Sequence, residues 1–276
     1  MIARAALVAA YTLVELRRRR LLLAFVVIEV LLVAGIGIAP LVVAPGSTGE
    51  ARALFLLSVL SGTLGPALFI CAIALGMTII RQDVDSGALA AILAKPLSRS
   101  GYAAGKLLAA IATLALVDGV FTAGCAILLA LDGGGHVGIL AVDLAATAAN
   151  AALVMLVVMV LTVHWTGVLA ALVGIGVLFV DSILATLHTA VQGGTITSSF
   201  WRPAVEIAYG VLPRALEGDL AHDILQTSLR LHPGARPTLP PGGLPAASGM
   251  GDVVAWAVWL TALCVALGLA VRRKQV

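Results

Sequence analysis

The chain has 276 residues, of which 61% are hydrophobic and 11% are charged, and its mean hydropathy is +1.10. A soluble globular domain carries about 25% charged residues, so this composition indicates an integral membrane protein. The high hydrophobicity excludes intrinsic disorder, and a net charge of only +3 with 5% aromatic residues excludes a nucleic-acid-binding protein. The cysteines lie far apart within apolar runs, which predicts neither a disulfide framework nor a CxxC metal site.

Long apolar runs predict the spans. A bilayer core roughly 30 Å thick requires about 20 consecutive apolar residues in a helix. Six runs of this kind cover residues 21–44, 53–80, 104–131, 137–163, 167–190 and 252–271. The first run exceeds the roughly 7 to 15 apolar residues of a signal peptide, so we expect it to remain as an anchor. The sequence therefore predicts one all-α integral membrane domain over residues 1–276.

Charges at the borders of these runs predict the orientation, because cytoplasmic loops carry an excess of Lys and Arg. Basic blocks at 17–20 and 272–274 precede the first span and follow the last. We therefore expect a multi-pass protein of the cytoplasmic (inner) membrane with both termini and the loop 81–103 inside. The segment 191–251 would lie outside, although it contains four arginines.

Shorter amphipathic segments flank the spans. Residues 2–16 have an apolar helical face and predict an N-terminal surface helix within residues 1–20. Apolar residues recur at near-helical spacing between 205 and 229, interrupted by Pro213. This pattern predicts one or two amphipathic helices at the outer face, within the extracytoplasmic segment 191–251.

The loop between the second and third spans predicts a short helix over residues 84–94. Leu89, Ile92 and Leu93 form its apolar face, and Pro96 must end it because proline disfavours helical geometry in the preceding residue. Such a helix is roughly 16 Å long, too short to span a bilayer. It is either an ordinary surface helix or an element that couples the spans to a partner.

This loop resembles that of the type-two permeases of ABC transporters, which reads as an acidic residue, Gly-Thr, a leucine-rich turn, Lys-Pro, an aliphatic residue, Ser-Arg and a later Gly-Lys. The matching positions are Asp83, Asp85, Gly87, Leu93, Lys95, Pro96, Leu97, Ser98, Arg99, Gly105 and Lys106. Ala88 replaces the usual Thr, and aspartates stand where glutamate is common. The layout of the whole chain is similar too, most of all to the copper-site-maturation permease branch.

The resemblance implies the permease subunit of an ABC exporter, with two permease copies and two separate ATPase subunits encoded beside it. The loop would dock on the ATPase through Asp83, Asp85, Gly87, Leu89, Ile92, Leu93, Lys95, Pro96 and Arg99. ATP and Mg²⁺ would bind to that partner, whereas this chain would hold no cofactor or metal and would catalyse no reaction. The sequence itself also predicts no ATP site in this chain, because the segment 101–106 lacks the glycine spacing and the Ser or Thr of a phosphate-binding loop.

Small residues in the fifth span have two interpretations. Gly167, Ala170, Ala171 and Gly174 would permit close approach of the same span from a second permease copy. The same spacing equally suits helix packing within one subunit.

Two carboxylates lie inside predicted spans. At 1.5 Å per residue, Glu29 and Asp118 are both roughly 13 to 18 Å from the inner boundary, near the bilayer midplane. A charge there costs about 2.5 to 3.5 kcal/mol, so these side chains should face protein or water, or be protonated. They predict a polar substrate path or a proton-sensitive gate, or else hydrogen bonds between helices. They also leave open an ATP-independent cation- or proton-coupled carrier or channel.

Overall fold

The computed structural model describes residues 2–18, 20–43, 49–87, 98–131, 136–232, 244 and 247–273. All regular secondary structure within these residues is helical, and six of the helices are long and apolar enough to cross a membrane. The prediction of an all-helical, multi-pass membrane protein is thereby confirmed. The expected helix over 84–94 falls largely on residues 88–97, which lie outside the described residues.

The helices follow the predicted apolar runs closely. The spanning helices are α2 (Leu21–Val43), α3 (Glu50–Thr78), α6 (Arg99–Leu131), α7 (Val137–Thr162), α8 (Gly167–Gln192) and α11 (Met250–Arg273). The shorter helices are α1 (Ile2–Arg18), α4 (Arg81–Asp85), α9 (Trp201–Val211) and α10 (Leu220–Leu231). The helix α6 begins before its apolar run, because the Ser98 hydroxyl accepts a hydrogen bond from the Gly101 amide at 3.1 Å and so caps the first turn.

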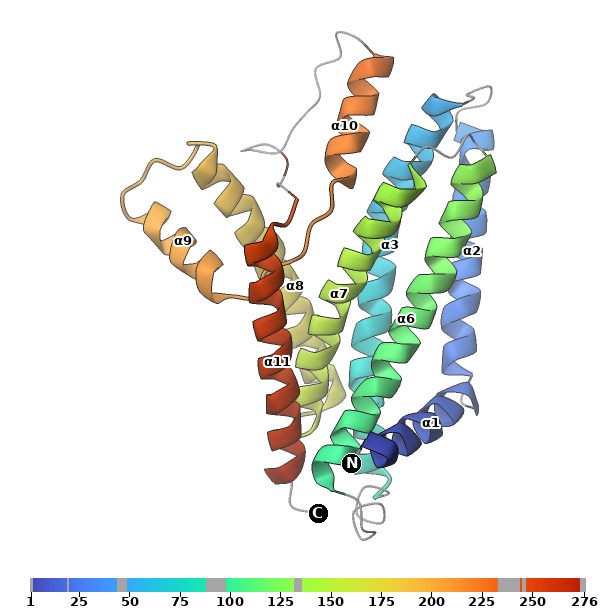
Figure 1. Ribbon diagram of the computed structural model, residues 1–276, viewed down its shortest axis with the longest axis vertical. Coiled ribbons are helices and arrows are strands. Elements are labelled where there is room, and N and C mark those ends of the chain that lie inside the picture. Colours follow the sequence, from blue (N-terminus) through green and yellow to red (C-terminus); the bar gives the residue numbers. More distant parts are fainter. Residues whose placement is uncertain are drawn as a thin grey trace.

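The two ends of the helix bundle differ in charge (Figure 1). At one end lie α1, α4, the start of α6 and the end of α11. We call it the basic end, after Arg17, Arg18, Arg20, Arg81, Arg99, Lys106, Arg272 and Arg273. At the other end, the distal end, α9 lies beside the end of α8, and α10 lies beside α3 and α7. Acidic and basic residues are mixed there: Arg202, Glu206, Arg214, Glu217, Asp219, Asp223 and Asp252.

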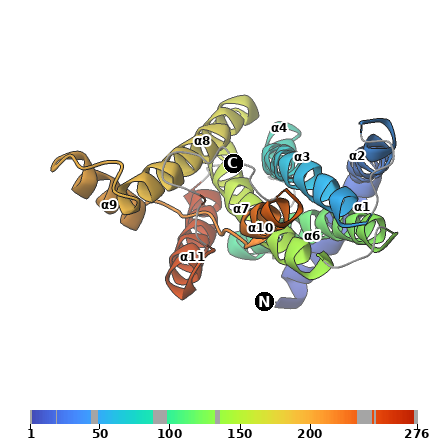
Figure 2. The same ribbon diagram turned by 90° about the horizontal axis from the view of Figure 1, so that it is seen from above.

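The helix α7 lies centrally and packs against α3, α6, α8 and α11 (Figure 2). Glycine permits the closest of these contacts. A Cβ atom at Gly76 of α3 would lie 2.9 Å from the Met155 carbonyl oxygen of α7, and one at Gly174 of α8 would lie 2.6 Å from Val158 Cγ2. Ala170 of α8 is also fully buried. These small residues of the fifth span therefore pack within the subunit.

At the basic end, α1 packs mainly against α6 and only lightly against α2. Gly105 of α6 makes this approach possible, because an added Cβ would lie 2.5 Å from Val8 Cβ and 2.7 Å from the Ala5 carbonyl oxygen. Ala5 and Leu16 are buried in this contact. The helix α1 is thus docked on the start of α6, near the segment that carries the permease-like motif.

The expected amphipathic segment at the distal end consists of two helices, α9 and α10, separated by residues 212–219. Val205 of α9 packs with Leu184 and Val191 of α8. Leu220 of α10 joins the core formed by α3, α6 and α7. Pro213 lies in the connection, which is the interruption that the sequence predicted.

Candidate functional site

A buried cluster of charges joins α4 to α6 at the basic end. Lys106 Nζ lies 2.8 Å from Asp83 Oδ2 and 3.8 Å from Glu15 Oε2 of α1. The Tyr102 hydroxyl donates a hydrogen bond to Asp83 Oδ2 at 2.5 Å. The exposed fractions of the Asp83 and Lys106 side chains are only 8% and 5%. Asp83, which the motif assigns to partner contact, is therefore paired inside the chain.

The neighbouring arginines attach the same segment to the α7–α8 connection and to α11. Arg81 forms an ion pair with Asp85, with Nη2 2.8 Å from Oδ1, and its Nη1 donates to the Trp165 carbonyl oxygen between α7 and α8 at 3.1 Å. On the far side of the loop, Arg99 Nη1 donates to the Arg272 carbonyl oxygen of α11 at 2.9 Å. Both borders of the loop are thus fixed to the spans.

The described residues include part of the predicted coupling site. Asp85 is exposed, and Gly87 ends the segment at a φ of +70°, a backbone conformation that glycine adopts without strain. Arg99 lies at the start of α6. The other predicted residues are outside the described residues: Leu89, Ile92, Leu93, Lys95 and Pro96.

The two carboxylates within the spans come from adjacent helices. Glu29 of α2 is 4% exposed and Asp118 of α6 is half-buried. Among the described residues, neither Glu29 Oε2 nor Asp118 Oδ1 has a hydrogen-bond partner, although both atoms are buried. The helices α2 and α6, which carry the two carboxylates, pack against each other. The structure therefore brings together the two acids that share one depth in the sequence.

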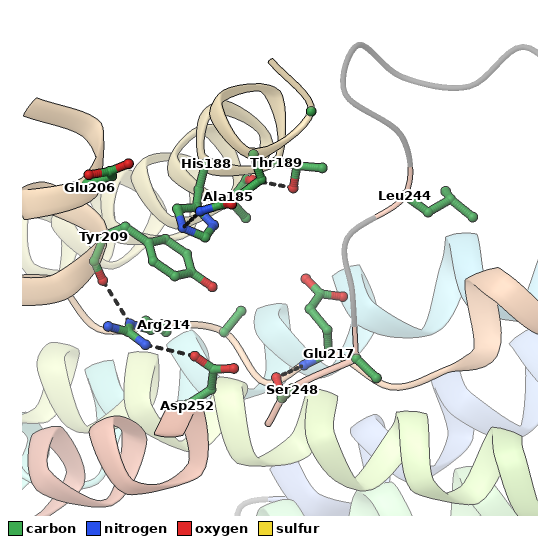
Figure 3. Close-up of a pocket in the computed structure, with 14 residues that line it drawn as sticks. Ala185, His188, Thr189, Glu206, Tyr209, Arg214, Glu217, Leu244, Ser248 and Asp252 are labelled. Atoms are coloured by element: carbon green, nitrogen blue, oxygen red, sulfur yellow. Dashed lines mark hydrogen bonds and ion pairs between the residues drawn. The ribbon is translucent and has the colours of Figure 1, made fainter. Parts of the chain in front are cut away.

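Sequence reasoning missed a third group of side chains, which surrounds a cavity of about 620 Å³ at the distal end (Figure 3). The His188 ring of α8 stacks on the Tyr209 ring of α9 with a centroid distance of 3.7 Å. The Arg214 guanidinium lies 4.7 Å from the centre of the Tyr209 ring and forms an ion pair with Asp252 of α11 at 2.8 Å. The excess of arginine in a segment expected outside was the available signal for this group.

Other polar contacts hold the distal helices on the bundle. The Asn150 side chain of α7 forms two hydrogen bonds with the Leu216 backbone, at 2.8 and 2.9 Å. His136 Nδ1 lies 2.6 Å from Asp223 Oδ2 of α10. Within the described residues, no group of three or more His, Cys, Asp or Glu side chains is arranged to hold a metal ion.

These features define a class: a multi-pass helical membrane protein with a charged, internally paired segment at one end and two carboxylates within its spans. No family model matches the chain, and no curated protein matches it significantly.

Proposed function

We propose that this protein is the transmembrane permease subunit of an ATP-driven ABC exporter, energised by a separate ATPase subunit. The basic end would face the cytoplasm, where its cations suit the orientation rule for membrane proteins. The observation that carries the proposal is the segment 81–106, in which Arg81 bonds the α7–α8 connection, Lys106 pairs with Asp83, and Arg99 bonds the end of α11. A loop that is bonded to the bundle at both borders can transmit a displacement from a docked partner to several spans.

In this proposal the partner surface consists of Asp85, Gly87 and the loop residues that follow them. The exposed side chain of Asp85 at the end of α4 and the positive φ of Gly87 support it. Two permease copies and two ATPases would form the complete exporter, as the resemblance implies. Gly174 and Ala170 are occupied by packing within one subunit, so the contact between copies would use other surfaces.

The second candidate function is an ATP-independent carrier or channel for protons or cations. It is favoured by the buried, unpartnered oxygens of Glu29 and Asp118. An unpaired carboxylate within a membrane is costly, and such residues commonly mark ion pathways. In a permease the same pair would line the substrate path.

The two functions are separated by adding the ATPase. We expect the tagged chain to co-purify with the ABC-type ATPase encoded beside it and to raise its ATP hydrolysis. Leu89→Asp should abolish both effects because a charge would enter an apolar contact. Leu229→Asp is the matched control, a half-exposed leucine on α10 far from the proposed contact.

The carrier function predicts a different result. Liposomes containing the chain alone and a pH-sensitive dye would dissipate an imposed proton gradient, and Glu29→Gln with Asp118→Asn would stop the flux. Flux without ATPase, together with no ATPase binding, would overturn the permease proposal. ATPase stimulation that is lost in Leu89→Asp and kept in Leu229→Asp would overturn the carrier.

A further inference from the structure

The buried ion pair between Asp83 and Lys106 calls for a physical reason. Removing two charges from water costs more than their attraction usually returns, so well-packed apolar side chains would stabilise the fold at least as well. A buried pair is favoured instead where one specific geometry must be kept. Here the pair is completed by the Tyr102 hydroxyl, so Asp83 contacts two residues on successive turns of α6.

The cluster is the main connection between α4 and α6. The helix α4 continues α3 after a break of two residues and lies mainly against α3, with little backbone packing on α6. Its attachment to α6 therefore depends on the side chains of Asp83, Tyr102 and Lys106. Glu15 adds α1 to the same cluster, because its carboxylate lies 3.8 Å from Lys106 Nζ.

Lys106 also lies on the span that carries Asp118. Twelve residues separate them, roughly 18 Å along a helix at 1.5 Å per residue. A displacement of α4 would pull on Lys106 and move α6 as a rigid element, so that the displacement reaches the depth of Glu29 and Asp118.

We propose that Asp83 is a positioning residue that transmits movement of α4 to α6 through Lys106, and does not itself contact the ATPase. This inference rests on the proposed permease function. It reverses the role that the motif gives to Asp83, because a side chain that is 8% exposed and paired at 2.8 Å presents little surface to a partner.

The test measures transmission without requiring a substrate. Spin labels are placed at Leu131 and Met250, exposed residues at the distal ends of α6 and α11, with the three native cysteines replaced by alanine. Pulsed EPR then gives the distance between the labels in the complex with the neighbouring ATPase, with and without ATP and vanadate. The variants are Asp83→Asn, the neutral pair Asp83→Asn with Lys106→Gln, and the control Glu206→Gln in an exposed ion pair.

We expect the nucleotide to change the distance in the wild type and in the control. Asp83→Asn should still co-purify the ATPase but lose the change, since a neutral Asn holds the Lys106 ammonium more weakly and the charged Glu15 then competes for it. The double variant should regain it, because Asn and Gln amides can hydrogen-bond without charge. A normal change in Asp83→Asn, no rescue in the double variant, or no change in a wild-type complex that hydrolyses ATP would each overturn the inference.

A separate readout distinguishes this inference from the proposed function. A single spin label at Ser86, which is exposed beside α4, reports local mobility in the chain without any ATPase. Mobility should rise in Asp83→Asn and return to the wild-type value in the double variant. If the wild type fails to bind the ATPase, the proposed permease function is wrong. Unchanged mobility in Asp83→Asn overturns the positioning role even if the ATPase binds.

Discussion

The basic end and the distal end both contain ion pairs, but the pairs differ in burial. Asp83 and Lys106 are 8% and 5% exposed and lie beneath α1, whereas Arg214 and Asp252 are 22% and 23% exposed beside a cavity. The side chains of Arg202 and Glu206 of α9 are more exposed still, at 62% and 45%. A buried pair fixes one arrangement of helices because losing either partner is costly, while water can replace a partner at the surface. The basic end is thus built to hold its geometry, and the distal end is able to change it.

The contrast has a basis in the packing. At the basic end, α1 packs closely on α6 at Gly105, the residue before Lys106. At the distal end, α9 packs on α8 through a small cluster that includes Leu184, Val191 and Val205. Helices with few buried apolar contacts open at lower free-energy cost than core helices do. Movement is therefore expected first around α9.

The largest expected effect is an all-or-none difference in labelling. Three spans separate Ser86 from Ser199, so the two ends must lie on opposite sides of the membrane. In intact cells an impermeant maleimide should label Ser199→Cys and leave Ser86→Cys unlabelled until the cells are permeabilised. The reverse pattern would invert the orientation, and equal labelling of both would contradict the count of spans.

A second prediction compares buried and exposed pairs by stability. Lys106→Met leaves the Asp83 carboxylate buried without its cation and should lower the free energy of unfolding by about 3 to 5 kcal/mol. Arg202→Met removes one partner of an exposed pair and should cost less than about 1 kcal/mol. Reversible unfolding in mixed micelles with increasing SDS measures both. Similar losses of unfolding free energy in the two variants would show that the buried pair at the basic end holds the fold no more strongly than the exposed pair at the distal end.

The smallest effect is expected at the cavity. Arg214→Ala removes a half-exposed ion pair and the stacking on Tyr209, which together should contribute about 1 kcal/mol. Hydrogen exchange should accelerate in α9 and remain unchanged in α1. Arg230→Ala, an exposed arginine on α10, serves as the control. Faster exchange across the whole chain would mean that Arg214 supports the global fold and not the local position of α9.

The spans were predictable because each needs only one long apolar run, a property of the local sequence. The break between α9 and α10 was predictable for the same reason, since Pro213 acts on its own backbone. The pairing of Asp83 with Tyr102 was not, because nineteen residues separate them and only the folded chain brings their side chains together. The stack of His188, Tyr209 and Arg214 likewise depends on how α9 folds back onto α8.

The close contact at Gly105 also constrains the order of events during synthesis. The chain is made from its N-terminus, yet the docking surface for α1 is on α6, which is completed far later than α1. Until then α1 lacks its main packing surface, including the contact of Ala5 with Gly105. An amphipathic helix in that position is held at the lipid headgroups. The helix α1 would thus dock only after α6 has been made, long after its own synthesis.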